Sequence, residues 1–280
     1  AAADGCLFVP VRGGNFDGHA FIGDARRQGA LLVLTEVPLE SEPYILVPDA
    51  LMALQRIAAA YRQLFPIPVV AITGSMGKTS TKEMIASVLS ERFCVHKNQG
   101  NLNNQTGLPL TVFQLGREHE VSVVELGTNH FGEIEPIARI VSPDVCVFTN
   151  IGVSHIEFFG SREGIFREKT AMLLYQKPGG ATIVNGDDDL LLAIPGAVRF
   201  GLDEGCDVRA TDISDLGLDG VAFTAHCGGE EFALHVRAPG KHTVYNALSA
   251  IAVGLHFGMS LAELKRGLES FSTPHGRLDV

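Results

Sequence analysis

A glycine-rich segment between an apolar stretch and a helical pattern carries the clearest chemical signal. It reads Gly74-Ser75-Met76-Gly77-Lys78-Thr79-Ser80. Glycines let successive backbone amides turn toward phosphate oxygens, Lys78 adds a positive charge, and the Thr79 hydroxyl suits Mg2+. The spacing departs from the commonest phosphate-binding loop, since Ile72 stands where its first glycine would be. We therefore expect all seven residues to line a nucleotide phosphate site, with a chance glycine turn as the alternative.

Two further polar side chains follow apolar, strand-like runs. Glu125 stands near the end of the run 121–126, and His155 comes after the run 144–150. In a parallel sheet the ligand lies beyond the carboxyl ends of the strands, so both side chains are expected near the phosphate loop. Glu125 is a candidate metal ligand. The alternatives are a solvated carboxylate and a histidine that is only a satisfied polar residue.

The segment 100–109 gathers three asparagines and a threonine in one loop. It reads Gly100-Asn101-Leu102-Asn103-Asn104-Gln105-Thr106-Gly107-Leu108-Pro109. Carboxamides can hold a polar substrate by directed hydrogen bonds. Asparagine also favours turns for its own sake, which is the alternative.

The elements that must position these residues alternate between buried strands and helices. Short runs rich in Val and Ile at 69–73, 121–126, 144–150 and 181–185 are typical of a parallel sheet covered on both faces. Helical patterns occupy 79–91, 133–141 and 163–175 between them, and 243–257 and 261–271 at the end. The segment 208–236 alternates around turn signals, which predicts antiparallel strands at one edge. The fold class is therefore α/β, with a central, mostly parallel sheet flanked by helices.

A smaller α/β unit precedes this sheet. Strands are expected at 7–9, 31–34 and 44–47 and a helix near 21–28, followed by a helix over 49–65 with Asp49 as its cap. Pro66 and Pro68 disfavour helix in the residues before them and mark a linker. We therefore expect an N-terminal domain over 1–66 and a central domain over 67–280.

Composition excludes several classes of partner. The chain has 280 residues, 46% of them hydrophobic, and a formal net charge of -10. This charge argues against nonspecific binding to nucleic acid or to an anionic membrane. The five cysteines are scattered without a CxxC pair, and no apolar run could span a bilayer, so we expect a cytoplasmic protein. The chain begins at Ala1 rather than Met, which suggests a piece of something longer.

Several segments together resemble the Mur ligase family, the ATP-dependent amide-forming enzymes of peptidoglycan precursor synthesis. The similar segments are 73–81, 100–111, 124–133, 150–161, 185–188, 240–250 and Gly276-Arg277. Within the family, the asparagine loop, the segment 125–130 and the opening segment 7–21 are most similar to the member that joins D-Ala-D-Ala to UDP-MurNAc-tripeptide. The resemblance implies an N-terminal domain for the UDP end of the substrate, incomplete here, a central ATP-binding domain, and a C-terminal domain that is missing.

The resemblance also implies roles for the residues around the phosphate loop. Lys78 would contact the β- and γ-phosphates of ATP, Thr79 and Glu125 would hold one Mg2+, and His155 would help hold a second. Lys169 matches a lysine that CO2 converts to a carbamate, whose new carboxylate supports the second metal. Carbamylation requires a neutral amine, so burial and nearby charge must lower the lysine pKa. As an alternative, Lys169 could pair with Glu168 or with another acidic residue on the helix face.

Other residues match positions that contact nucleotide or substrate in the family. Asn246 matches an adenine-contacting asparagine, and Arg277 matches an arginine near the nucleotide. Their alternatives are a helix-start amide and a surface charge. The expected substrate contacts are Asn104 and Thr106 for the muramyl peptide, and Arg12, Asp17 and His19 in the N-terminal domain. The resemblance further implies a monomer.

Three competing interpretations remain at this point. The chain could be another ligase of the same superfamily, such as a different Mur step or folylpolyglutamate synthase, although the asparagine loop weighs against this. It could be a phosphate-loop switch or motor, but it has no recognisable guanine-reading segment. It could also be a nucleotide-binding fragment without activity of its own, because the closing domain is absent.

Overall fold

A nine-stranded sheet forms the centre of the computed structural model, which describes residues 5–13, 16–40 and 43–271. Its strand order is β12-β11-β10-β9-β8-β7-β4-β6-β5. The strands are β4 (Val69–Thr73), β5 (Val95–Lys97), β6 (Val121–Glu125), β7 (Val145–Phe148), β8 (Ala181–Asn185), β9 (Val198–Gly201), β10 (Val208–Asp215), β11 (Val221–Cys227) and β12 (Glu230–Val236). Neighbouring strands pair in parallel from β5 to β10 in this order, including β4. Strand β11 pairs antiparallel with both β10 and β12. The mostly parallel sheet with an antiparallel edge is therefore confirmed.

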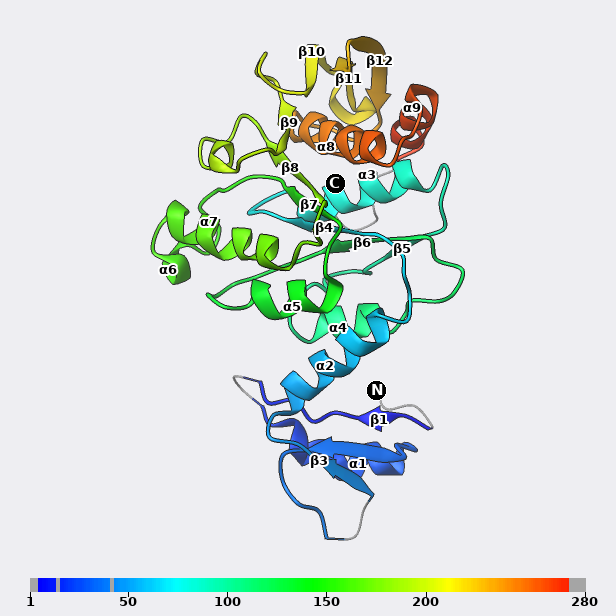
Figure 1. The fold of residues 1–280 in the computed structure, drawn as a ribbon, viewed down its shortest axis with the longest axis vertical. Coiled ribbons are helices and arrows are strands. Elements are labelled where there is room, and N and C mark those ends of the chain that lie inside the picture. The colour runs from blue at the N-terminus through cyan, green and yellow to red at the C-terminus, as the bar shows by residue number, and fades with distance from the viewer. Residues whose placement is uncertain (1–4, 14–15, 41–42, 272–280) are drawn as a thin grey trace.

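Helices cover both faces of this sheet, because alternate strand residues point to opposite sides. Val70 and Ile72 pack in one core with α3 (Lys78–Leu89), α8 (His242–His256) and α9 (Leu261–Glu269). Val69 and Ala71 pack in a second core, with α4 (Gly107–Val112), α5 (Ile134–Val141) and α7 (Arg162–Thr170). The two layers are visible in Figure 1, with α3 and α8 on one side of the sheet and α4 and α5 on the other.

A small parallel sheet lies at the N-terminal end of the molecule (Figure 1). It consists of β1 (Leu7–Phe8), β2 (Leu32–Thr35) and β3 (Tyr44–Leu46), with a 3-10 turn (Gly18–Phe21) and α1 (Ile22–Arg27) between β1 and β2. Helix α2 (Ala50–Arg62) then runs to the large sheet and contacts α4 and α5. The Asp49 carboxylate accepts a hydrogen bond from the Met52 amide at 2.7 Å, so the predicted cap is present.

Two differences from the sequence-based expectation have physical causes. The helix expected over 163–175 ends at Thr170 and continues as a 3-10 turn over Ala171–Tyr175. The Thr170 hydroxyl donates to the Phe166 carbonyl at 2.7 Å, a local bond that tends to bend a helix. The elements β5, β9, α4 and α6 (Ile156–Phe159) were not expected, because each has only three to six residues and is too short to show a period.

Candidate functional site

The glycine-rich loop joins β4 to α3, as the sequence predicted. Gly77 has φ +80° at the start of α3, and Gly74 has φ +150°. A Cβ on Gly74 would lie 1.9 Å from the Thr149 Oγ1, so only glycine fits there. The Lys78 Nζ donates to the Gly74 carbonyl at 2.9 Å and therefore lies over the loop. This is the backbone arrangement that exposes amides and a cation to phosphate.

Thr149 and Asn150, which directly follow the neighbouring strand β7, hold the loop by hydrogen bonds. The Asn150 carbonyl accepts from the Ser75 amide at 2.9 Å, and its Oδ1 accepts from the Met76 amide at 3.0 Å. The Thr149 hydroxyl donates to the Met76 carbonyl at 2.6 Å. Sequence reasoning missed both residues. The polar pair at the end of a predicted buried strand was the available signal.

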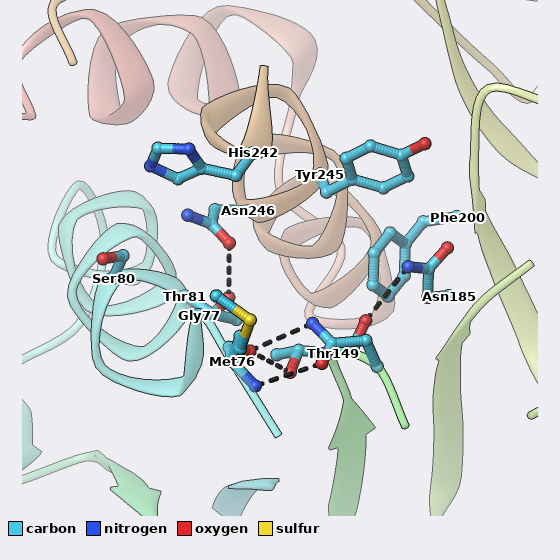
Figure 2. Close-up of a pocket in the computed structure, with 11 residues that line it drawn as sticks. Met76, Gly77, Ser80, Thr81, Thr149, Asn185, Phe200, His242, Tyr245 and Asn246 are labelled. Carbon is cyan, nitrogen blue, oxygen red and sulfur yellow. Dashed lines mark hydrogen bonds between the residues drawn. The ribbon is translucent and has the colours of Figure 1, made fainter. Parts of the chain in front are cut away.

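A cavity of about 420 Å3 opens beside the loop, between α3 and α8 (Figure 2). Its lining residues are Met76, Gly77, Ser80, Thr81, Thr149, Asn150, Asn185, Phe200, His242, Tyr245 and Asn246. The Tyr245 hydroxyl donates to the Asp187 carboxylate at 2.8 Å. Burial, followed by this bond, raises the pKa of Tyr245, so the phenol stays protonated. The cavity combines aromatic walls with carboxamides, which suits a nucleobase.

Asn246 lies in this cavity with one end of its carboxamide fixed. Its Oδ1 accepts from the Thr81 hydroxyl at 3.0 Å (Figure 2). Its Nδ2 is buried and has no hydrogen-bond partner among the described residues. A buried amide donor without a partner is costly, so the site favours a ligand that supplies an acceptor. A ring nitrogen of a purine is such an acceptor.

The side chains of Thr79 and Glu125 are in contact next to the phosphate loop. The Thr79 hydroxyl donates to the Glu125 Oε2 at 2.6 Å, and the Asn103 Nδ2 donates to the Oε1 at 2.7 Å. Glu125 is only 3% exposed, so the solvated-carboxylate alternative does not describe it. A hydroxyl and a carboxylate in contact are hard oxygen donors of the kind that Mg2+ prefers. Asn103 belongs to the asparagine loop but was not singled out from the sequence.

Lys169 is buried, with 4% of its surface exposed. Burial, followed by the positive charge of Lys78, lowers its pKa to about 7. Glu168 does not hold the amine, because its carboxylate accepts from the backbone amides of Gly132, Glu133 and Ile134 at the start of α5, at 2.8 to 3.0 Å. An amine with this pKa is substantially neutral near pH 7 and therefore nucleophilic.

His155 lies at the surface of the molecule. His155 is exposed at the start of α6, where its φ is +60°. Within residues 5–13, 16–40 and 43–271, no group of three or more His, Cys, Asp or Glu side chains could hold a metal ion. Arg277 lies outside the described residues. The predicted second metal therefore has no preformed ligand cluster of these residue types there.

The asparagine loop uses Asn104 to start a helix. The Asn104 Oδ1 accepts from the amides of Thr106 and Gly107 and from the Thr106 hydroxyl, at 2.8 to 3.2 Å. This bonding is the turn-forming role that was left open as the alternative. Both side chains are exposed, so a substrate contact stays a prediction.

The three residues predicted to contact substrate in the N-terminal unit, Arg12, Asp17 and His19, lie close together. The Arg12 guanidinium approaches Asp17 at 3.4 Å and Glu36 at 3.3 Å. The His19 Nδ1 lies 2.6 Å from the Asp17 carboxylate, and the His19 amide lowers the pKa of that carboxyl. Glu36, which sequence reasoning missed, also accepts from the Ala50 amide at the start of α2. The cluster thus links the small sheet to the connecting helix.

Comparison with known families agrees with this geometry. A family described as the Mur ligase middle domain matches residues 72–254, from the end of β4 to α8. The chain belongs to the Mur ligase family. The matched segment includes the phosphate loop, Glu125, Lys169 and Asn246. It also includes every residue that lines the cavity.

Individual Mur ligases match beyond that part. The chain is 39% identical to UDP-N-acetylmuramoyl-tripeptide--D-alanyl-D-alanine ligase from Bacillus subtilis, over 98% of the chain and 61% of that ligase. A crystal structure of MurF from Acinetobacter baumannii superposes with a TM-score of 0.94 at 35% identity, over 99% of the chain and 62% of that protein. MurF from Thermotoga maritima in complex with ADP gives a TM-score of 0.90 at 30% identity, over 99% and 65%.

The chain thus spans about three-fifths of the length of these relatives. The matched part includes both the small N-terminal sheet and the large sheet. Among the helices of the described residues, none combines the length and the apolar character that a membrane span requires.

Proposed function

We propose that this chain is the N-terminal and central part of an ATP-dependent ligase that joins D-Ala-D-Ala to UDP-MurNAc-tripeptide in peptidoglycan precursor synthesis. One observation carries the proposal: similarity to ligases of that name runs through 98% of the chain, including the small N-terminal sheet as well as the nucleotide cavity. The buried Glu125 and Lys169 beside the phosphate loop support the same activity.

The proposed reaction has two steps. The terminal carboxylate of the tripeptide attacks the γ-phosphorus of ATP, which releases ADP and leaves an acyl phosphate. The amine of D-Ala-D-Ala then attacks the acyl carbon, phosphate departs, and the amine proton is lost as the amide forms. Negative charge accumulates on phosphoryl oxygens in the first step, so positioning and cations should supply most of the rate.

The residues of the phosphate loop and around it then have proposed parts. Lys78 and the loop amides bind the β- and γ-phosphates, and Asn246 binds adenine through its Nδ2. Thr79 and Glu125 hold Mg2+, which when bound supplies positive charge to the phosphate oxygens. We propose the same metal-holding part for His155, acting on a second ion.

Lys169 has a separate proposed part that follows from its lowered pKa. Its neutral amine adds to CO2 and loses a proton, which converts the neutral amine into a negatively charged carbamate. This carboxylate would support the second metal in a place where the described residues offer no cluster of acids. Asn104, Thr106, Arg12, Asp17 and His19 are the proposed substrate contacts, and Arg277 is a further proposed nucleotide contact.

The organisation of the whole protein belongs to the proposal as well. We place the boundary between the UDP-substrate domain and the ATP-binding domain at residues 66 and 67, and we propose a cytoplasmic monomer. The relatives are longer than this chain, so a further domain would complete the site.

The test uses the full-length protein with ATP, Mg2+ and UDP-MurNAc-tripeptide, with and without D-Ala-D-Ala. Phosphate release that requires both the tripeptide and the dipeptide supports the ligase. Phosphate release that requires neither the tripeptide nor the dipeptide would instead indicate a phosphate-loop NTPase of another class. Release that requires a different amine would indicate another ligase of the superfamily.

A further inference from the structure

Strand β5 ends two residues before it could pair with the end of β6. Lys97, the last residue of β5, lies opposite Val123, whereas Glu125 is two residues farther along β6. In a parallel pair, the N–H and C=O of one residue point to the same neighbour. The Leu126 amide bonds to Ile72 of β4, so the Glu125 peptide groups face the side where β5 has stopped.

The side chain of Asn98 takes the place of the missing strand. Its Oδ1 accepts from the Glu125 amide at 3.0 Å, and its Nδ2 lies 3.4 Å from the Glu125 carbonyl as donor. Asn98 is fully buried. A carboxamide has the same donor and acceptor pair as a peptide group, so it can extend the ladder by one step. The backbone of Glu125 is thereby fixed on both sides.

Asn98 is itself held by a buried lysine from α3. Lys82 is 1% exposed, and its Nζ donates to the Asn98 carbonyl at 2.6 Å. The same amine pairs with Glu83 at 2.9 Å, so its charge is compensated. Helix α3 also carries Thr79, whose hydroxyl donates to the Glu125 carboxylate. The contacts therefore form a closed path from Thr79 along α3 to Lys82, Asn98 and Glu125.

We propose that Asn98, clamped by Lys82, is a positioning residue for Glu125, which sets the distance between the Thr79 hydroxyl and the carboxylate. The inference rests on the proposed role of Thr79 and Glu125 in holding Mg2+. Neither Asn98 nor Lys82 contacts the metal in this scheme. Their contribution is geometric, because groups that orient metal ligands typically change metal affinity by about tenfold or more.

Binding of Mn2+ to the full-length protein tests this directly, without turnover. The protein is saturated with a nonhydrolysable ATP analogue, and free Mn2+ is followed by its electron paramagnetic resonance signal. We expect Asn98→Ala to weaken Mn2+ binding by about tenfold, with binding of the analogue in EDTA unchanged. Lys82→Met, which keeps a long apolar side chain in the buried space, should weaken it in the same direction but less.

Matched variants control for composition and for folding. Asn101→Ala removes an exposed asparagine three positions after Asn98, and Lys265→Met removes a half-buried lysine of α9. Both should bind Mn2+ as the unchanged protein does. Should Asn98→Ala not fold, Asn98→Ser and Lys82→Met provide the comparison, each checked by its thermal unfolding.

Glu125→Gln separates this inference from the metal assignment itself. If Glu125→Gln weakens Mn2+ binding and neither Asn98→Ala nor Lys82→Met does, the positioning role is wrong and the metal assignment stands. If Glu125→Gln also binds Mn2+ normally, both are wrong. Weakening in all three variants supports the positioning role.

Discussion

At the scale of single residues, Lys169 has the most unusual environment. Burial lowers its pKa from 10.5 to about 7, and the charge of Lys78 acts in the same direction. The unfolded chain therefore binds a proton at this residue between about pH 7 and pH 10 that the folded chain does not bind. The free energy of unfolding therefore rises as the pH increases from about 7 to 10, and it falls by the same amount as the pH decreases over that range.

We expect the unchanged protein to gain stability relative to Lys169→Met as the pH rises from 7 to 10, by at most about 1.4 kcal/mol per pH unit. Urea unfolding in CO2-free buffer measures the difference. Lys241→Met, at an exposed lysine, should show no such trend. A flat difference between the unchanged protein and Lys169→Met would mean that the buried amine keeps its ordinary pKa.

The same residue also permits a chemical test of the proposed carbamate. Lys169→Ala should lose ligase activity, and short carboxylates such as formate or acetate should restore part of it, because they supply the missing negative group. Steady-state rates with increasing carboxylate concentration measure this rescue. Full activity of Lys169→Ala without any additive would contradict the role.

Gly74 offers a second test at residue scale. Gly74→Ala adds a Cβ at φ +150° that meets the Thr149 hydroxyl at 1.9 Å, so the loop must move. We expect loss of nucleotide binding and a cost in stability beyond the roughly 1–2 kcal/mol of left-handed strain alone. Gly179→Ala is the matched control, since its φ is +78° but nothing lies within 4 Å. Thermal unfolding and ADP titration compare the two, and equal effects would show that the clash with Thr149 has no importance.

At the scale of elements, Glu168 joins two helices. Its carboxylate caps the start of α5, and it precedes Lys169 in α7. We expect Glu168→Ala to destabilise the protein by about 2 kcal/mol, because three backbone amides lose their acceptor. Glu157→Ala, on the exposed face of the neighbouring α6, should change stability by less than about 0.5 kcal/mol. Chemical denaturation of both variants decides whether the cap matters.

The sequence predicted most of these elements because their signals are local. The strands β4, β6, β7 and β8 are runs of Val and Ile, and the glycine loop carries its own conformational preference. The parts it could not predict depend on distant contacts. Thr149 and Asn150 act on a loop more than 70 positions earlier, and Asn98 replaces a strand partner across 27 positions. Contacts between such distant residues leave no periodic pattern in the sequence.

At the scale of the whole molecule, α2 ties the small sheet to the large one. Ala58 of α2 is fully buried in the same apolar cluster as Val69 of β4 and Ile137 of α5. We expect Ala58→Asp to lower the free energy of unfolding by about 3 kcal/mol or more, because a charge would enter that cluster. Ala60→Asp, on the exposed side of the same helix, serves as the control. Urea titration followed by circular dichroism compares them, and similar midpoints would mean that α2 is not part of the core.

The bond between Thr81 and Asn246 spans 165 positions of the chain, and this separation matters during protein synthesis. A ribosome that has just released the phosphate loop still needs roughly 8 to 33 s to reach Asn246, at about 5–20 residues per second. Throughout that interval the nascent chain has the phosphate loop without the other wall of the nucleotide cavity. Contacts from both walls of the cavity to a nucleotide therefore become possible only after synthesis has reached Asn246.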